Sequence, residues 1–169
     1  KKLLWYLLFV FLALSFLLYG NTIRGQFVSD DALFTYRSDL KDGSSLGSLW
    51  LKPYLPDHRE AGVWRPFATF STSLQFILFG VSPVSFHIRN IVLNGLASFL
   101  VLLITYELFH RKRLSMLSSL LFAFFPIHTE AVAYSKSGVD LWGALFFLLS
   151  WMTFLRATKG KSVRTGALL

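Results

Sequence analysis

The sequence predicts an all-α polytopic membrane protein with about four spanning helices and a long first outer loop that carries short amphipathic helices. Of its 169 residues, 54% are hydrophobic and only 15% are charged, whereas a soluble domain averages about 25% charged residues. The hydrophobic residues gather into runs long enough to cross a bilayer. No cysteine is present, so neither a disulfide nor a thiolate metal site can form.

The placement of charge gives the expected topology. A net charge of +8 is compatible with nucleic-acid binding, but its distribution argues against that partner. With spans at 3–20, 83–109, 114–127 and 139–155, the whole excess of basic residues falls at one face, whereas bases and acids balance at the other. The positive-inside rule then places the N-terminus in the cytoplasm. We expect a lipid bilayer, and no nucleic acid, as the partner of this surface.

The first predicted segment, residues 1–20, is a spanning helix. Lys1 and Lys2 precede an almost uncharged run from Leu3 to Gly20. At 1.5 Å per residue the run gives roughly 26 Å of helix, which is enough to cross a thin bilayer. Because no small-x-small cleavage site follows, we interpret the run as a span and not as a removed signal peptide.

Residues 21–82 form the predicted outer loop, and a loop of this length indicates function. Ser29 is suited to cap a short helix over residues 30–40. A second helix is predicted after Pro66, over residues 67–79, because apolar residues recur there at helical spacing with polar residues between them. This helix is too short to span a bilayer, so we expect it to lie in the outer interface.

Residues 83–109 are the second predicted span. His87, Asn90 and Asn94 share one face of this helix, where polar groups must meet other helices or a wet cavity and not lipid. We interpret this face as inter-helix hydrogen bonding in preference to catalysis. Arg89 points elsewhere and is close enough to the outer end to reach the level of lipid phosphates.

The third predicted span, residues 114–127, is unusually short. Its roughly 21 Å of helix falls below the hydrocarbon thickness of about 30 Å, so either Pro126 lies within the membrane or the bilayer thins locally. A second outer loop follows at 128–138, and a fourth span at 139–155. The last segment, 156–169, is predicted to be cytoplasmic and to lead into a longer chain.

Asp30 and Asp31 are the candidate catalytic residues. The ordinary interpretation of two acids directly after Ser29 is a favourable charge at a helix N-terminus. The functional interpretation is a general base that accepts a proton from an acceptor hydroxyl, or a metal ligand. Two neighbouring carboxylates in a partly dry site would ionise unequally, which suits such a division of roles.

Further polar residues are expected at the same membrane face, and they are candidates for binding substrate or phosphate. Arg65 either pairs with Glu60 or clamps a phosphate. His128 and Glu130 either link helices or face the Asp30–Asp31 pair across a common pocket, which is the arrangement we expect. A divalent metal held by Asp31, His128 and Glu130 stays open, although this spacing is not a metal signature. The binding candidates are Arg65, Arg89, His128, Glu130 and Asp140.

The motifs that carry these residues resemble a known family. In chain order they are Phe27-Val28-Ser29-Asp30-Asp31, Trp64-Arg65-Pro66-Phe67, Phe86-His87 with Asn90, Pro126-Ile127-His128-Thr129-Glu130-Ala131-Val132, and Asp140. Together they are similar to the GT-C superfamily of membrane glycosyltransferases. The nearest likeness is to the N-terminal part of the transmembrane and tetratricopeptide-repeat O-mannosyltransferases and their bacterial relatives.

The resemblance implies an enzyme that transfers a sugar from a polyprenyl-phosphate donor to an acceptor hydroxyl, on a protein or a glycan, at the non-cytoplasmic side. It assigns the base or metal-ligand role to Asp30 and Asp31. It also implies that Arg65 belongs to a Tyr-Arg-Pro motif, and that His128 and Glu130 belong to the second outer loop. Further spans and soluble helical repeats are expected beyond this segment, which alone is expected to be inactive.

Two other functions stay open. A membrane scaffold, or a subunit that works with other subunits, would keep the GT-C-like fold and lose the activity. The chain departs from the family pattern at Asn94 and Phe125, where the family commonly or often carries His. A transporter is less favoured, because no inverted repeat is visible. The absence of cysteine and of an Asn-x-Ser/Thr sequon favours a bacterial inner membrane over the endoplasmic reticulum.

Overall fold

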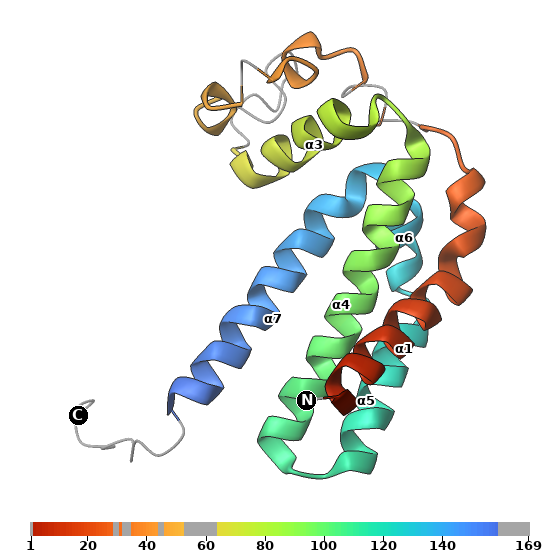
Figure 1. The fold of residues 1–169 in the computed structure, drawn as a ribbon, viewed down its shortest axis with the longest axis vertical. Helices are drawn as coiled ribbons and strands as arrows, with labels where there is room; N and C mark the ends of the chain where they lie inside the picture. The colour runs from red at the N-terminus through yellow and green to blue at the C-terminus, as the bar shows by residue number, and fades with distance from the viewer. Residues whose placement is uncertain (1, 29–30, 32–34, 44–45, 53–63, 159–169) are drawn as a thin grey trace.

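The fold is an all-α bundle with a helical cap at one end (Figure 1). The structure is a computed structural model that describes residues 2–28, 31, 35–43, 46–52 and 64–158. Among these residues there are helices but no strands, which confirms the predicted fold class. The α-helices are α1 (Lys2–Tyr19), α3 (Pro66–Phe79), α4 (Pro83–Phe109), α5 (Lys112–Phe124), α6 (His128–Ala133) and α7 (Gly138–Thr158).

Three helical stretches in the described part are long and apolar enough to cross a membrane: Lys2–Arg24, Pro83–Phe109 and Ser135–Thr158. The first and last of them extend α1 and α7 by the 3₁₀ turns η1 (Gly20–Arg24) and η5 (Ser135–Ser137). Figure 1 shows α1, α4, the α5–α6 pair and α7 running in alternating directions between the capped end and the opposite end. The chain is therefore an integral membrane module.

Between α4 and α7 the chain forms two helices, α5 and α6, in the region where a single short helix is predicted over 114–127. Pro126 has no N–H and its ring blocks the preceding turn, so α5 cannot continue through it. The chain crosses the break in tight turns, with the His128 N–H donating to the Phe125 carbonyl (3.2 Å) and the Thr129 N–H to the Pro126 carbonyl (3.0 Å). Helix α6 then resumes toward the capped end.

Helix α4 is the centre of the bundle and packs against α1, α5 and α7. Gly95 allows α1 to approach closely, since a Cβ there would lie 3.0 Å from Leu12 Cδ2 and 3.1 Å from Leu12 Cα. Ser15 Oγ donates to the Ile91 carbonyl (2.8 Å), and Asn94 Nδ2 donates to Ser15 Oγ (3.1 Å). Small residues and buried hydrogen bonds of this kind hold helices together in lipid.

The outer loop folds into a cap in which α3 lies across the end of the bundle, as Figure 1 shows. Pro66 opens α3 and Gly80, at φ 69°, ends it. Leu40 and Leu49 from the loop pack with Phe76 of α3 into one buried cluster. The described parts of the first outer loop therefore pack against α3.

The helix predicted over residues 30–40 is not continuous. Asp31 and Thr35 are helical, but Tyr36 and Arg37 leave the helix, and Ser38–Leu40 form a separate 3₁₀ turn. Arg37 breaks the pattern because its backbone is extended (φ −74°, ψ 105°). Its side chain instead pairs with Asp39 at 2.7 Å. Ser29 and Asp30, the predicted cap and one of the two candidate acids, lie outside the described residues.

Candidate functional site

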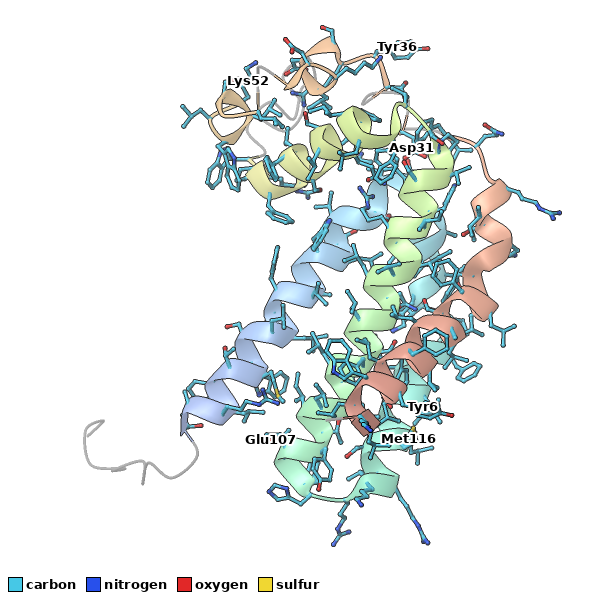
Figure 2. All side chains as sticks on the ribbon, viewed as in Figure 1. Tyr6, Asp31, Tyr36, Lys52, Glu107 and Met116 are labelled. Atoms are coloured by element: carbon cyan, nitrogen blue, oxygen red, sulfur yellow. The ribbon has the colours of Figure 1, made fainter. Side chains whose placement is uncertain are left out.

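Asp31 joins the first outer loop to the second. One carboxylate oxygen accepts the Val28 N–H (3.1 Å), and the other accepts the Lys136 N–H (2.9 Å), although Lys136 lies 105 residues further along the chain. The side chain is buried, with only 3% of its residue surface exposed. Figure 2 labels Asp31 at the capped end of the bundle, beside the start of α4.

Burial raises the pKa of the Asp31 carboxyl above its ordinary value. Two hydrogen bonds act in the opposite direction, because the N–H groups of Val28 and Lys136 favour the charged form. Desolvation outweighs them. A carboxylate whose pKa is moved toward neutral pH is a stronger proton acceptor than an ordinary aspartate, so Asp31 has the electrostatics expected of a general base.

Arg89 holds three elements together beside Asp31. Its Nη1 donates to Gln75 Oε1 of α3 (2.9 Å), and its Nη2 donates to the Ser135 carbonyl of η5 (2.8 Å). Nε and Nη2 both donate to Asn90 Oδ1, at 3.1 and 3.0 Å. The guanidinium also lies over the ring of Phe86, 4.7 Å from its centroid. Arg89 therefore fixes the cap and the start of α7 to α4.

A small cavity lies beside Asp31, between the outer loops, α3, α4 and the start of α7. Its volume is about 10 Å³, which is room for roughly one water molecule. Neither a sugar nor an acceptor residue fits in it, so the site is closed in this conformation. The lining residues come from both outer loops and from α3, α4 and α7: Phe27, Asp31, Ser71, Thr72, Phe76, Phe86, Arg89, Ser135, Lys136 and Val139.

A larger apolar groove lies on the other side of Arg89. Its volume is about 560 Å³, and it runs between α3, α4 and Trp142 of α7. Arg89 and Ser71 line both the groove and the small cavity, so they form the partition between the two. The remaining groove-lining residues are mainly apolar: Phe67, Phe70, Leu74, Gln75, Leu78, Phe79, Ser82, Val84, Ser85 and Ile88.

The other candidate binding residues do not line the Asp31 cavity. His128 packs on the ring of Phe122, with the two centroids 4.3 Å apart. Glu130 and Asp140 are exposed, and so is Arg65 at the start of α3. None of these four is among the lining residues of the cavity that Asp31 and Arg89 share.

The second outer loop meets Asp31 at Ser135 and Lys136 and not at the His128–Glu130 turn, so the expected common pocket is absent from this cavity. The physical reason is the direction of α6. The helix begins at His128, farther from the cap, and delivers only the residues after Ala133 to the level of Asp31. Nothing in the sequence indicated Ser135 or Lys136, because they act through backbone groups, the Ser135 carbonyl and the Lys136 N–H.

The residues proposed as metal ligands do not come together. Within the described part of the chain, no three or more His, Cys, Asp or Glu side chains lie close enough to hold a metal ion. The Asp31 oxygens accept peptide N–H groups, and the His128 ring stacks on Phe122. Asp31, His128 and Glu130 therefore do not fit the divalent metal that their residue types left open.

At Asn90 and Asn94 the polar face of α4 forms the predicted inter-helix hydrogen bonds. Asn90 Nδ2 donates to the carbonyls of Val132 (3.3 Å) and Tyr134 (2.9 Å). Asn94 binds the Ser15 hydroxyl of α1. His87 is also buried, and its ring lies against Gly25 at the end of η1.

Comparison with known proteins finds that the chain is similar to protein O-mannosyl-transferases. The chain is 32% identical to protein O-mannosyl-transferase Tmtc1 of Drosophila melanogaster, over 85% of this chain and 17% of the relative. It is 34% identical to mouse protein O-mannosyl-transferase TMTC1, over 85% of this chain and 16% of that protein. It is 33% identical to mouse protein O-mannosyl-transferase TMTC4, over 90% of this chain and 23% of that protein.

These similarities confirm the resemblance to transmembrane and tetratricopeptide-repeat O-mannosyltransferases that the motifs indicate. The chain spans about a fifth of the length of these curated relatives. They are animal proteins, so they lend no support to the expected bacterial inner membrane. No protein-family model matches the chain, and no solved structure matches it.

Proposed function

We propose, from the similarity of this chain to protein O-mannosyl-transferases, that it is part of a GT-C-type membrane glycosyltransferase. The full protein transfers a sugar from a polyprenyl-phosphate donor to an acceptor hydroxyl on the non-cytoplasmic side, and the N-terminus of α1 faces the cytoplasm. The names of the relatives favour mannose as the sugar and a protein hydroxyl as the acceptor.

One observation carries the proposal beyond the similarity. A buried carboxylate with a raised pKa, Asp31, lies at the junction of the two outer loops. Only the Arg89–Ser71 partition separates its cavity from an apolar groove of about 560 Å³. The Asp31 carboxylate suits the proton of the acceptor hydroxyl, and the Arg89 guanidinium suits the phosphate of the donor. The apolar groove beyond them suits the polyprenyl chain.

The reaction is an inverting displacement. Asp31 or Asp30 accepts the proton of the acceptor hydroxyl, whose oxygen forms a bond to the anomeric carbon of the sugar. The bond from that carbon to the phosphate oxygen breaks, and the lipid phosphate leaves with the electron pair. Arg89 or Arg65 stabilises the charge that develops on the phosphate. Phosphate is already a fair leaving group, so no strong acid is needed opposite the base.

Substrate entry requires the cap to open, because the Asp31 cavity holds about one water molecule. The polyprenyl chain occupies the groove beneath α3, which brings its phosphate to Arg89. Arg65, His128, Glu130 and Asp140 stay candidates for contacts with the sugar, the phosphate or the acceptor. They lie along the outer half of the module on exposed or half-buried positions.

A second function is favoured by a different observation. Both oxygens of Asp31 are taken up by peptide N–H groups, and the Arg89 side chain is hydrogen-bonded to Gln75, Asn90 and Ser135. Side chains whose hydrogen bonds hold the fold together are as compatible with a scaffold as with an enzyme. A GT-C-like subunit that organises a complex in the membrane is therefore the alternative.

Substituting the two acids in the full-length protein separates these functions. Asp31→Asn and Asp30→Asn keep the side-chain shape and remove the base. We expect loss of sugar transfer from a polyprenyl-phosphate donor in at least one variant. Asp31→Asn also turns one of the two accepting oxygens into an NH2 group, so its thermal midpoint should fall as well. Asp39→Asn is the matched control, since Asp39 belongs to the same loop but pairs with Arg37 away from the cavity. Full transfer activity in both test variants would remove the two acids from the mechanism, whereas a wild-type protein without transfer activity would favour the scaffold.

A further inference from the structure

An apolar groove lies at the end of the bundle opposite the cap. It has a volume of about 340 Å³ between α1, α4 and α5, and its lining includes Leu4, Leu7, Leu103, Tyr106 and Met116. Figure 2 labels Met116 at this end of the bundle. The lining is almost wholly apolar, so the groove suits a hydrocarbon chain.

Lys112 gives this groove a charged end. It lines the 340 Å³ groove and also a neighbouring open hollow that Arg111 and Arg113 line with it. All three side chains are exposed. Of the residues that the structure describes, no carboxylate forms a salt bridge with any of them.

The position of the basic residues matches the level of a lipid headgroup. His110 and Arg111 form the connection between α4 and α5, and Lys112 is the first residue of α5. On this helix the groove is lined from Lys112 to Met116. Basic residues at a membrane surface attract anionic lipids, and their N–H groups bind phosphate oxygens. A zwitterionic lipid offers the same phosphate but no net charge.

We propose that this groove binds an anionic glycerophospholipid, with one acyl chain between α1, α4 and α5 and its phosphate against Lys112 and the flanking arginines. The site lies at the opposite end of the module from Asp31 and Arg89. It is therefore independent of the proposed sugar transfer, and the lipid acts as a structural ligand there and not as a substrate.

Native mass spectrometry of the detergent-solubilised full-length protein tests the proposal, with dioleoyl phosphatidylglycerol and dioleoyl phosphatidylcholine as separate probes. Wild-type protein should retain the anionic lipid in preference to the zwitterionic one. Lys112→Gln should lower retention of phosphatidylglycerol about fivefold, the equivalent of about 1 kcal/mol for one basic residue near an anionic lipid. Arg156→Gln is the charge control, because Arg156 is an exposed base in the last turn of α7 that does not line the groove.

A second pair of variants tests the groove itself. Met116→Trp fills the apolar groove and should lower phosphatidylglycerol retention, whereas Leu121→Trp places the same ring on an exposed part of α5 outside the groove and should not. Equal retention of the two lipids by wild type would overturn the proposal. So would equal losses in Lys112→Gln and Arg156→Gln. Unchanged retention in Met116→Trp would likewise exclude the groove as the acyl-chain site.

Discussion

Gly138 at the start of α7 offers a sharp test of whether Arg89 joins α3 and η5 to α4. A Cβ at this position would collide with Nη2, Cζ and Nε of Arg89. Nε and Nη2 donate to Asn90, and Nη2 also donates to the Ser135 carbonyl, so Gly138→Ala must displace a guanidinium that joins η5 to α4. The three atoms nearest to the added Cβ all belong to Arg89.

The expected magnitude follows from two opposing effects. Hydrogen bonds to a charged group contribute about 1.5–3 kcal/mol each, so losing the Ser135 bond and weakening the Asn90 pair lowers the free energy of unfolding by about 2–4 kcal/mol. Replacing Gly by Ala in a helix returns about 0.5–1 kcal/mol. The net expectation is a destabilisation of about 1–3 kcal/mol.

Gly143 supplies the matched control on the same helix. A Cβ there meets nothing within 4 Å, so Gly143→Ala should stabilise the protein by about 0.5–1 kcal/mol. Thermal midpoints of the full-length variants in detergent, followed by fluorescence-detected size-exclusion chromatography, measure both changes. The Gly138→Ala loss should shrink in an Arg89→Ala background, where the collision partner is gone. A Gly138→Ala midpoint equal to or above that of Gly143→Ala would refute the claim that Arg89 stabilises the fold by joining η5 to α4.

Three further substitutions test the packing and the electrostatics. Gly95→Leu should separate α1 from α4 and lower the thermal midpoint more than Gly95→Ala does, because even a Cβ lies 3.0 Å from Leu12 Cδ2; equal midpoints would contradict the close approach. Asn90→Leu should destabilise the full-length protein by about 2–3 kcal/mol, since it removes the Asn90 donor from the Val132 and Tyr134 carbonyls and removes an acceptor of Arg89; chemical denaturation in micelles would measure the loss. Arg37 lowers the pKa of Asp39, so this pair contributes stability that is present above the unfolded pKa and is lost as pH falls through the folded one. Asp39→Asn should therefore lower the midpoint at neutral pH and have little effect in acid, and a loss of the same size at both pH values would exclude the ion pair as its cause.

The membrane fold and the position of α3 could be predicted from the sequence, because both depend on short stretches of chain. Pro66 and Gly80 begin and end α3, and its thirteen mixed residues after Pro66 are too few to cross a bilayer. The long apolar runs of α1, α4 and α7 specify spans by length alone. Each of these properties is written within one short stretch of chain, so no tertiary contact is needed to infer it.

The candidate site was only partly visible in the sequence, because its geometry depends on contacts between distant segments. Asp31 was identified from its position after the first span, but its partner Lys136 acts through a backbone N–H that no side-chain pattern reveals. Arg89 was expected at phosphate level. Its role in joining α3 to η5 requires Gln75 and the Ser135 carbonyl to converge on it. The direction of α6 after Pro126 determined which residues reach Asp31.

The link between Asp31 and the Lys136 N–H has a mechanical consequence. A single carboxylate joins the first outer loop to a peptide group 105 residues away, and a second hydrogen bond, from the Val28 N–H, fixes that carboxylate to its own loop. A force that lifts one loop therefore pulls on the other until this fastening breaks. Asp31, which is proposed to accept the proton, is also the residue that joins the two outer loops. Protonation of its carboxylate weakens these hydrogen bonds at the moment when product must leave.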